Sequence, residues 1–407
     1  MKNLTHRLII LFLAISLTSC HNLFKDDEED PNFQYLVNYE MVRSYIPVMI
    51  QTMLNSIEGD FSEISEIKER ATYGVIIYEI TYKTTFKGEP VLASGLVSVP
   101  SGEGTFDMIS YQNGTNTLHS NAPTVRPDRD LYMLIEAVAS TGFVVSLPDY
   151  LGFGVSDDMI HPYMHKTSTV QSVLDMMRAV KELAQILDFQ LTDDLYLTGY
   201  SMGGWATLQV QREIENNHSN EFNLKASAPA AGPHDLSFIN QQILESDSYP
   251  MPYFFGFMMN TYMHLEETTT PADEVLNHPY DSLVTVVFDG KRSGEEINAL
   301  LTTSIADLFT ENYRMNYSTD ETFASLRTVL EENSVEPWNI QTPTMIIHST
   351  GDELVPFDVA RKTHLDLLAA GTPDNLVQLV PLPDYSHSEG IVPAGILSIK
   401  WFLDLTK

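Results

Sequence analysis

Three side chains in this sequence, Ser201, Asp352 and His387, could act together as a nucleophile, an acid and a base. Serine alone is a poor nucleophile near neutral pH, so it needs a base that takes its proton and an acid that orients the base. Ser201 is the central residue of a Gly-x-Ser-x-Gly motif at residues 199–203, and the other two follow it in the order acid, then histidine. This combination predicts acyl transfer through a covalent intermediate.

The serine motif stands where a nucleophile elbow requires it. The apolar run at residues 195–198 predicts a strand that leads directly into the motif, and residues 205–212 have helical character. Gly199 and Gly203 lie two residues either side of Ser201, where a side chain would collide with its neighbours in so tight a turn. We therefore expect Ser201 at the carboxyl end of a strand with its hydroxyl exposed, and not in an ordinary turn.

The acid and the base are each expected in a loop that follows a strand. Asp352 comes directly after the predicted strand at residues 344–349, where a carboxylate can hold the far nitrogen of an imidazole. His387 lies between the last predicted strand, at residues 376–382, and the terminal helix. We therefore assign the acid to Asp352 and the base to His387.

Other carboxylates and histidines nearby fit these two roles less well. Glu353 and Asp358 are displaced toward a helix that starts near residue 357. His348 lies inside a predicted strand and His364 inside a predicted helix, so each is expected to serve packing or to face solvent.

An oxyanion hole needs two backbone N–H groups aimed at the negative charge that develops during attack. Met202, directly after the nucleophile, is expected to supply one of them. The other should come from the loop after the predicted strand at residues 106–111, from Gly114 or from Thr115. The sequence does not choose between these two.

The loops that carry these residues need one sheet to bring them together. From Tyr73 to Val99 apolar and polar residues alternate, as in paired, half-buried strands. Further along, short apolar strands alternate with amphipathic helical runs, which predicts βαβ units and a mostly parallel sheet. The predicted fold class is therefore α/β, with an antiparallel N-terminal edge on the sheet. The strands expected in the parallel part cover residues 106–111, 143–148, 195–200, 224–228, 344–349 and 376–382.

One insertion interrupts this alternation. Residues 233–342 contain several helical segments, and we expect them to form a cap over a core made of residues 35–232 and 343–407. The cap contains a run rich in aromatic residues and methionine at residues 253–263. Such runs often only pack a core, so packing is the alternative to a role in substrate binding.

The first residues of the chain predict export. Residues 1–19 have a short basic end, an apolar run and small residues, as in a secretory signal peptide. Cys20, the only cysteine in the chain, ends a Leu-Thr-Ser-Cys segment that resembles the lipobox of bacterial lipoproteins. This resemblance implies an acylated N-terminal cysteine that anchors the protein to a membrane. A cleaved signal followed by a chance cysteine is the alternative.

Residues 20–34 follow the signal as an acidic tether that is too charged to fold alone. The tether resembles the lysine-plus-acidic signal that sends some Gram-negative lipoproteins to the cell surface, which implies an outer-membrane location. A plain linker that holds the folded part away from the bilayer is the alternative.

The overall charge and the missing motifs exclude several classes of function. The formal net charge of −32 at pH 7 should repel nucleic acid and anionic headgroups. The sequence has no Gly-rich phosphate loop, no pair of cysteines and no histidines at metal-ligand spacing. We therefore predict no cofactor, no metal and no nucleic-acid partner.

These segments together resemble the α/β-hydrolase superfamily and, within it, the branch of secretory lipases and related esterases. The resemblance spans about residues 70–405 and rests on the elbow, on the two triad loops, and on residues 93–100, 110–115, 142–154 and 161–163. It implies a carboxylic ester hydrolase that acts on a small-molecule or lipid ester. Many members carry His-Gly in the oxyanion loop, whereas this chain has Asn113-Gly114, so what braces the loop here is open.

Two other functions remain as alternatives. One is a serine peptidase related to the prolyl oligopeptidases, which share the fold and the triad order; the lack of propeller repeats disfavours it. The other is a surface binding lipoprotein that has kept the fold without catalysis, because a fold does not prove a function. The filled triad positions favour an enzyme.

Overall fold

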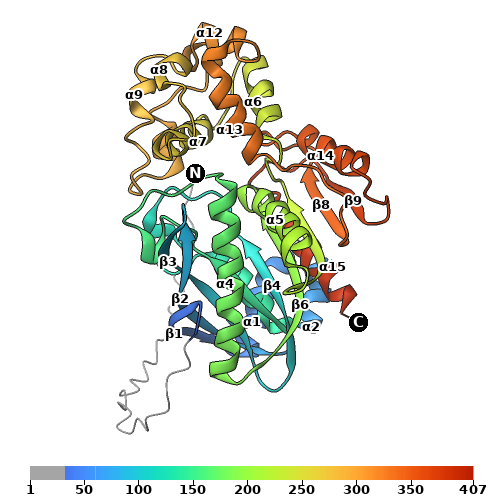
Figure 1. Ribbon diagram of the computed structural model, residues 1–407. Coiled ribbons are helices and arrows are strands. Elements are labelled where there is room, and N and C mark those ends of the chain that lie inside the picture. Colours follow the sequence, from blue (N-terminus) through green and yellow to red (C-terminus); the bar gives the residue numbers. More distant parts are fainter. Residues whose placement is uncertain (1–32, 60, 407) are drawn as a thin grey trace, which may run out of the picture. The chain divides into compact units, whose positions relative to one another are not determined.

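A mixed sheet of nine strands forms the centre of the described part of the chain (Figure 1). The computed structural model describes residues 33–59 and 61–406, so the predicted signal peptide, Cys20 and nearly all of the acidic tether lie outside the described residues. The strand order is β1-β2-β3-β5-β4-β6-β7-β8-β9. The strands are β1 (Leu36–Tyr45), β2 (Gly74–Phe86), β3 (Glu89–Ser101), β4 (Thr105–Gln112), β5 (Phe143–Pro148), β6 (Gln190–Tyr200), β7 (Asn223–Ala230), β8 (Thr344–Ser349) and β9 (Val377–Leu382).

The strand directions confirm the predicted fold class. From β5 across the sheet to β9, neighbouring strands are parallel. Strands β1, β2 and β3 pair antiparallel, and β3 joins the parallel part through an antiparallel pairing with β5. Strands β5 and β8 are buried along their whole length, which explains why they appear in the sequence as short apolar runs without alternation.

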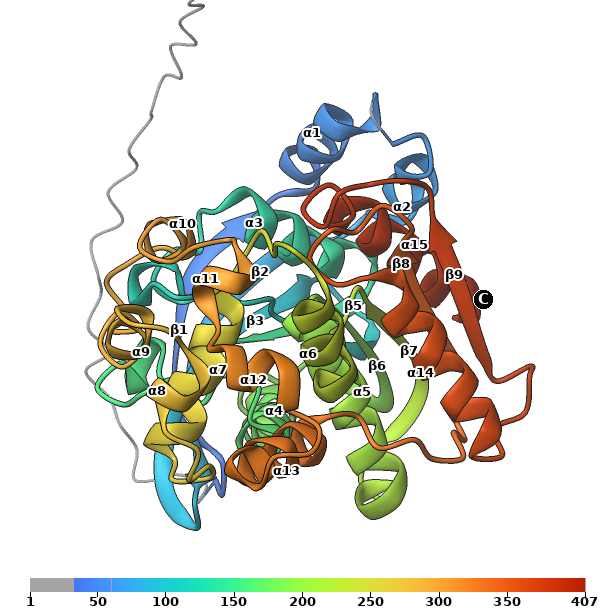
Figure 2. The ribbon, with the colours of Figure 1, turned by 90° about the horizontal axis from the view of Figure 1, so that it is seen from above.

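Helices cover both faces of the sheet (Figures 1 and 2). One face is covered by α4 (Lys166–Leu187) and α5 (Met202–Glu213), and the other by α1 (Pro47–Glu58), α2 (Ile64–Arg70), α3 (Asp130–Ala137) and α15 (Ile391–Leu405). Helix α14 (Phe357–Ala369) packs against β8 and β9. In the core beneath α15, the rings of Tyr196 and Phe402 lie 5.0 Å apart. No helix in the described residues is long and apolar enough to cross a membrane.

The sequence did not predict the elements that precede residue 73. Strand β1 is the edge of the sheet and leaves most of its side chains exposed, so its residues do not alternate between apolar and polar. Without that alternation an edge strand cannot be told from a loop. Helices α1 and α2 follow β1 and bury Ile50, Leu54 and Ile67 against the core.

The chain between β7 and β8 is helical and lies over the carboxyl ends of the parallel strands (Figure 1). This helical segment corresponds to the residues for which the sequence predicts a cap. Lys166, the first residue of α4, donates its backbone N–H to Asn333 in this region, so this end of α4 adjoins the cap. The helices are α6 (Leu236–Glu245), α7 (Tyr253–His264), α8 (Ala272–Val275), α9 (Tyr280–Leu283), α10 (Gly294–Asn298), α11 (Ile305–Leu308), α12 (Glu311–Asn316) and α13 (Ala324–Asn333).

A buried carboxylate ties the N-terminal strand to the body of the fold. Glu136, on α3, is 1% exposed and accepts a hydrogen bond of 2.8 Å from the hydroxyl of Tyr45, the last residue of β1. Its other oxygen has no hydrogen-bond partner, and the guanidinium of Arg43 lies 3.8 Å away. Burial opposes ionisation and raises the pKa of Glu136 to about 7, although Tyr45 and Arg43 act in the opposite direction.

This raised pKa predicts a loss of stability with rising pH. The folded state keeps the proton of Glu136 up to about pH 7, whereas an ordinary glutamate loses it near pH 4.5. Since the folded state binds more protons in this window, the free energy of unfolding should fall as pH rises through it. Glu136→Gln removes this titration. The free energy of unfolding of the variant, relative to that of the wild type, should therefore increase by up to about 3 kcal/mol from pH 5 to pH 8. Urea unfolding at both pH values measures this gain, and the exposed Glu40→Gln change is the matched control.

Candidate active site

Ser201 occupies the sharp turn between β6 and α5. Its backbone has φ 61° and ψ −125°, a conformation that residues with a side chain rarely adopt. The backbone N–H of Ser201 donates to Ala230, at the end of the neighbouring strand β7, at 2.9 Å. A Cβ atom at Gly199 would lie 2.5 Å from the carbonyl oxygen of Gly203, and one at Gly203 would overlap the carbonyl oxygen of Gln112. Both glycines are therefore required for the turn, as the sequence predicts.

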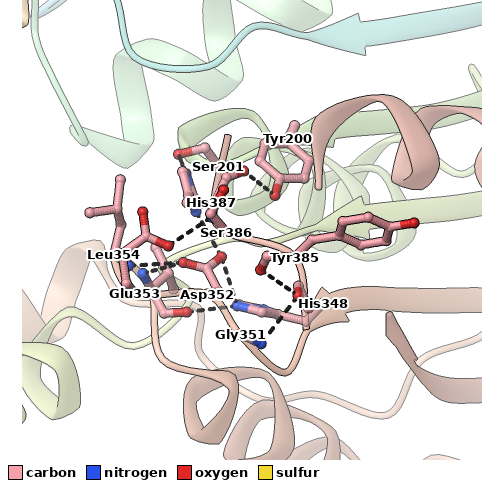
Figure 3. A network of polar contacts seen from close by, with 12 residues as sticks. Tyr200, Ser201, His348, Gly351, Asp352, Glu353, Leu354, Tyr385, Ser386 and His387 are labelled. Atoms are coloured by element: carbon pink, nitrogen blue, oxygen red, sulfur yellow. Dashed lines mark hydrogen bonds and ion pairs between the residues drawn. The ribbon is translucent and has the colours of Figure 1, made fainter. Parts of the chain in front are cut away.

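The three predicted triad side chains meet at the carboxyl edge of the sheet (Figure 3). Nε2 of His387 lies 2.9 Å from Oγ of Ser201, and Nδ1 of His387 lies 2.7 Å from Oδ2 of Asp352. The residues come from three separate loops, which follow β6, β8 and β9. Because Nδ1 must donate its hydrogen to the carboxylate, Nε2 is left free to accept the hydroxyl proton of the serine.

Asp352 is held as a carboxylate by three hydrogen bonds and one longer polar contact. Its Oδ1 accepts the backbone N–H groups of Leu354 at 3.0 Å and Val355 at 2.8 Å. Its Oδ2 is shared by His387 at 2.7 Å and by Nε2 of His348 at 3.3 Å. Burial opposes ionisation, but the hydrogen bonds from His348, His387 and the backbone outweigh it and hold the pKa of Asp352 well below its ordinary value. The carboxylate is thus charged and fixed in position.

His348 has a place in the site that the sequence did not predict. Its side chain is fully buried, and its Nε2 lies 2.8 Å from the carbonyl oxygen of Val355 as well as close to Asp352. Since a carbonyl can only accept, Nε2 carries the hydrogen and is directed at the site. His348 is buried within β8, in agreement with the packing expectation, and it also contacts the acid of the candidate triad, which the sequence did not predict. Its position four residues before Asp352 was the one available signal.

The backbone of His387 is clamped from both sides. The carboxylate of Glu353 accepts the His387 N–H at 2.9 Å, and the hydroxyl of Tyr200 donates to the His387 carbonyl at 2.6 Å. Burial raises the pKa of Tyr200 well above its ordinary value, so the hydroxyl keeps its proton. Glu353, which the sequence offers as a rival acid, instead supports the loop of the base. Neither contact could be predicted, because both depend on how distant loops meet.

His348 gives a prediction that separates positioning from packing. His348→Leu removes the Nε2–H group that lies 3.3 Å from Asp352, and loss of this polar contact should lower kcat about tenfold without changing KM. With one donor fewer the carboxylate should stabilise the imidazolium of His387 more strongly, so the acid limb of the kcat/KM profile should move to higher pH. His348→Gln, which keeps an N–H donor, should recover most of the loss. A purely structural role would leave the pH profile unchanged.

The candidate oxyanion loop lies beside the nucleophile. A Cβ atom at Gly114 would lie 3.4 Å from the carbonyl oxygen of Tyr200 and 3.9 Å from Cβ of Ser201, so this backbone adjoins the reacting hydroxyl. Thr115 directs its hydroxyl to Tyr163 at 3.0 Å. Met202 is buried as the first residue of α5, directly after Ser201. The structure thus places Gly114 and Met202 beside the elbow, whereas the side chain of Thr115 contacts Tyr163.

Asn113 braces this loop. Its side-chain amide donates to the carbonyl of Pro148 at 3.3 Å, and its own carbonyl accepts the hydroxyl of Tyr150 at 3.2 Å. The neighbouring Asp149 is buried and bonded to Ser94 and Thr124, which fixes the segment that carries Tyr150. The loop is therefore braced from the end of β5.

A narrow apolar cavity opens next to Ser201. Its volume is about 50 Å³, enough for a few water molecules. Helices α6 and α7 form one wall, and Leu354 and Val355 form the other. The lining residues are Tyr163, Met164, Ser201, Pro233, Leu236, Ile239, Asn240, Ile243, Tyr249, Phe254, Phe255, Met258, Leu354 and Val355. A larger cleft of about 1100 Å³ between α6, α12 and α13 is lined by charged side chains but by none of the triad.

The aromatic and methionine run of the cap is divided between the buried interior and the cavity at Ser201. Phe257, Met259 and Tyr262 are buried and pack the cap, as the packing alternative predicts. Phe254 and Met258 line the cavity at Ser201. Among the described residues no group of three or more His, Cys, Asp or Glu side chains could hold a metal ion.

Comparisons with known proteins agree with this geometry. The sequence model of the family described as Secretory lipase matches residues 117–380. Among solved structures, a rice cell wall degrading esterase, LipA from Xanthomonas oryzae, is 26% identical with a TM-score of 0.77, and the alignment covers 92% of this chain and 98% of that one. No curated protein matches the sequence significantly.

Two structures of lower sequence identity share the fold. A protein from Legionella pneumophila that is described as a putative hydrolase is 23% identical with a TM-score of 0.82 over 92% of this chain and 99% of that one. Lipase A from Candida antarctica in its closed state is 16% identical with a TM-score of 0.62 over 89% and 82% of the two chains. At this level of identity the likeness concerns the fold alone.

Proposed function

Because this chain belongs to the secretory lipase family and is an ester hydrolase of the lipase and esterase type, we propose that it works as a serine esterase through an acyl-enzyme. The proposal rests on one observation above all, the hydrogen-bonded chain from Ser201 through His387 to Asp352. A serine hydroxyl, an imidazole and a buried carboxylate in this order form the arrangement that activates serine in unrelated hydrolases.

In the acylation step, Oγ of Ser201 attacks the carbonyl carbon of the ester while Nε2 of His387 takes the hydroxyl proton. Asp352 orients the imidazole and stabilises the imidazolium that forms, and its fully satisfied carboxylate keeps this orientation without water. The imidazolium then gives the proton to the leaving alkoxide. The products of this half-reaction are the free alcohol and an ester of Ser201 with the acyl group.

The oxyanion of the tetrahedral intermediate is expected to bind between the N–H of Met202 and the N–H of Gly114. Gly114 is preferred to Thr115 because its backbone lies against the elbow. One such donor contributes about 10²–10³ in kcat in hydrolases of this type.

In the deacylation step, a water molecule takes the place of the alcohol. His387 removes a proton from this water, the hydroxide attacks the acyl carbon, and Ser201 recovers its proton as it leaves. The clamp on the His387 backbone by Glu353 and Tyr200 supports both steps, because the same imidazole must act twice from one position.

The cavity at Ser201 supports a short, apolar acyl group. Its walls are almost entirely apolar, and its small volume leaves no room for a long chain unless the cap moves. Ile239 and Ile243 on α6 lie in the wall and limit the depth. We therefore propose an esterase that prefers acyl groups of about four carbons.

Hydrolysis of p-nitrophenyl acetate, butyrate, octanoate and palmitate tests this proposal. The kcat/KM value for butyrate should exceed that for palmitate by about tenfold or more, since each methylene that cannot be buried forfeits binding energy. Ile239→Trp should fill the cavity and lower kcat/KM for butyrate while acetate is retained. A preference for palmitate would contradict the assignment of the cavity, and no turnover of any ester would favour peptide substrates or a binding role.

We also propose that the enzyme is an exported lipoprotein, anchored at Cys20 to the outer membrane at the cell surface. The signal-like residues 1–19, the lone cysteine and the acidic tether support this location. Incorporation of an alkyne-tagged palmitate into the wild type, and its absence from Cys20→Ser, would be the expected result.

A further inference from the structure

Exposed apolar side chains are concentrated at the start of the described chain. Fifteen large apolar residues are exposed in the described residues, and seven of them lie between Val37 and Met49. The most exposed of these seven are Met41 at 60%, Ile46 at 59% and Val48 at 62%. Single exposed apolar residues are normal, but seven within thirteen consecutive residues of an edge strand and the following helix turn are the concentration expected of an interaction surface. We name residues 37–49 the N-terminal edge.

The N-terminal edge comprises the outer strand of the sheet and the first turn of α1. Strand β1 pairs on one side only, with β2, and α1 stands at the margin of the molecule beside α2, away from the cap helices (Figures 1 and 2). Tyr39, exposed on β1, adds a ring with a polar tip of the kind that is enriched where protein meets the lipid headgroups.

The local charge differs from that of the whole protein. Residues 33–49 contain one acidic side chain, Glu40, and one basic side chain, Arg43, in a chain with a net charge of −32. The rest of the surface should be repelled by anionic membranes, whereas this segment carries no net charge. A zwitterionic lipid surface fits an apolar, uncharged edge of this kind.

The point at which the tether leaves the fold is fixed beside the N-terminal edge. The carboxylate of Glu182, in the last turns of α4, accepts the backbone N–H groups of Gln34 at 2.8 Å and of Leu36 at 2.6 Å. Glu182 lies toward the end of α4 that is remote from Lys166 and the cap. The stretch from Cys20 to Gln34 can span at most about 50 Å, so a bilayer that holds an acylated Cys20 is within reach of the edge.

We propose that the N-terminal edge seats on the lipid bilayer in which the acylated Cys20 is anchored. This inference rests on the proposed lipoprotein anchor and is independent of the catalytic chemistry. Each exposed apolar side chain contributes little binding free energy to a membrane by itself. Once the lipid on Cys20 holds the protein at the bilayer, contact between the N-terminal edge and the bilayer becomes an intramolecular event, so even a weak surface interaction is populated. Since α1 lies away from the cap, the cap faces away from the bilayer, and substrates reach Ser201 from the aqueous side.

Lipid quenching of a single fluorophore tests the seating. Cysteine is introduced into the full exported chain at Met41 or Val48, or at the control positions Val286 and Leu365, which are 64% and 56% exposed on the cap and on α14. Cys20 is the only natural cysteine, so acylation leaves one reactive thiol per chain. Each bimane-labelled protein is reconstituted in phosphatidylcholine vesicles that contain a spin-labelled phosphatidylcholine.

We expect the spin-labelled lipid to quench bimane at residues 41 and 48 at least twofold more than at residues 286 and 365. Equal quenching at all four positions, with one thiol labelled per chain, would overturn the seating. Two labelled thiols per chain would show that Cys20 is free and would overturn the anchor and the seating together. Hydrolysis of p-nitrophenyl butyrate by the same samples reports on the esterase separately, and circular dichroism verifies the fold.

Discussion

Ser201→Ala should abolish ester hydrolysis while leaving the fold intact. Loss of the nucleophile of a serine hydrolase lowers kcat by a factor on the order of 10⁶, and only weak catalysis by the oxyanion donors remains. The fold should survive because alanine is smaller than serine and the turn is set by Gly199 and Gly203. The strained backbone at φ 61° is also held by the bond from the residue 201 N–H to Ala230.

The measurement is the kcat of wild type and variant on p-nitrophenyl butyrate, with thermal unfolding as the test of folding. Ser388→Ala, at an exposed serine beside His387, is the matched control and should keep full activity. Activity that survives in Ser201→Ala would mean that another residue is the nucleophile.

Asp352→Asn should lower kcat by a factor of about 10⁴ without disturbing the geometry of the site. The two backbone N–H groups of Leu354 and Val355 fix which oxygen the asparagine keeps, because they require an acceptor at the Oδ1 position. The amide nitrogen then replaces Oδ2 and faces Nδ1 of His387. Two donors cannot bond, so the imidazole must move its hydrogen to Nε2, where it can no longer accept the proton of Ser201.

Asp358→Asn provides the control for this prediction. Asp358 was a rival acid by sequence, but its half-exposed side chain pairs with Arg361 on the surface of α14. Its removal should change kcat less than twofold, since exposed ion pairs contribute little. If Asp358→Asn were the damaging change and Asp352→Asn the harmless one, the acid would be misassigned.

The parallel core and the triad could be predicted because both leave local signals. Strands β5 and β8 are buried on both faces, so each is an uninterrupted apolar run between turns. The elbow requires Gly199 and Gly203 around one serine, and the fold orders the acid and the base after it. A single sequence contains all of this information within short windows.

The rest depends on contacts between distant residues. Strand β1 was missed because its exposed apolar side chains resemble neither a core strand nor a polar loop. His348, Glu353 and Tyr200 are ordinary residues in the sequence, and their bonds to Asp352 and His387 exist only once three loops have met. The bracing of the oxyanion loop by Asn113 likewise depends on the end of β5.

Covalent labelling of the folded protein by a fluorophosphonate probe tests the central claim most directly. The probe reacts only with a serine whose hydroxyl is activated by a neighbouring base, so it reports the function of the triad without any assumption about the substrate. We predict one label per chain, located at Ser201 by peptide mass spectrometry, with labelling lost in Ser201→Ala and strongly slowed in Asp352→Asn. A folded wild-type protein that does not label, or that labels at another serine, would contradict the account.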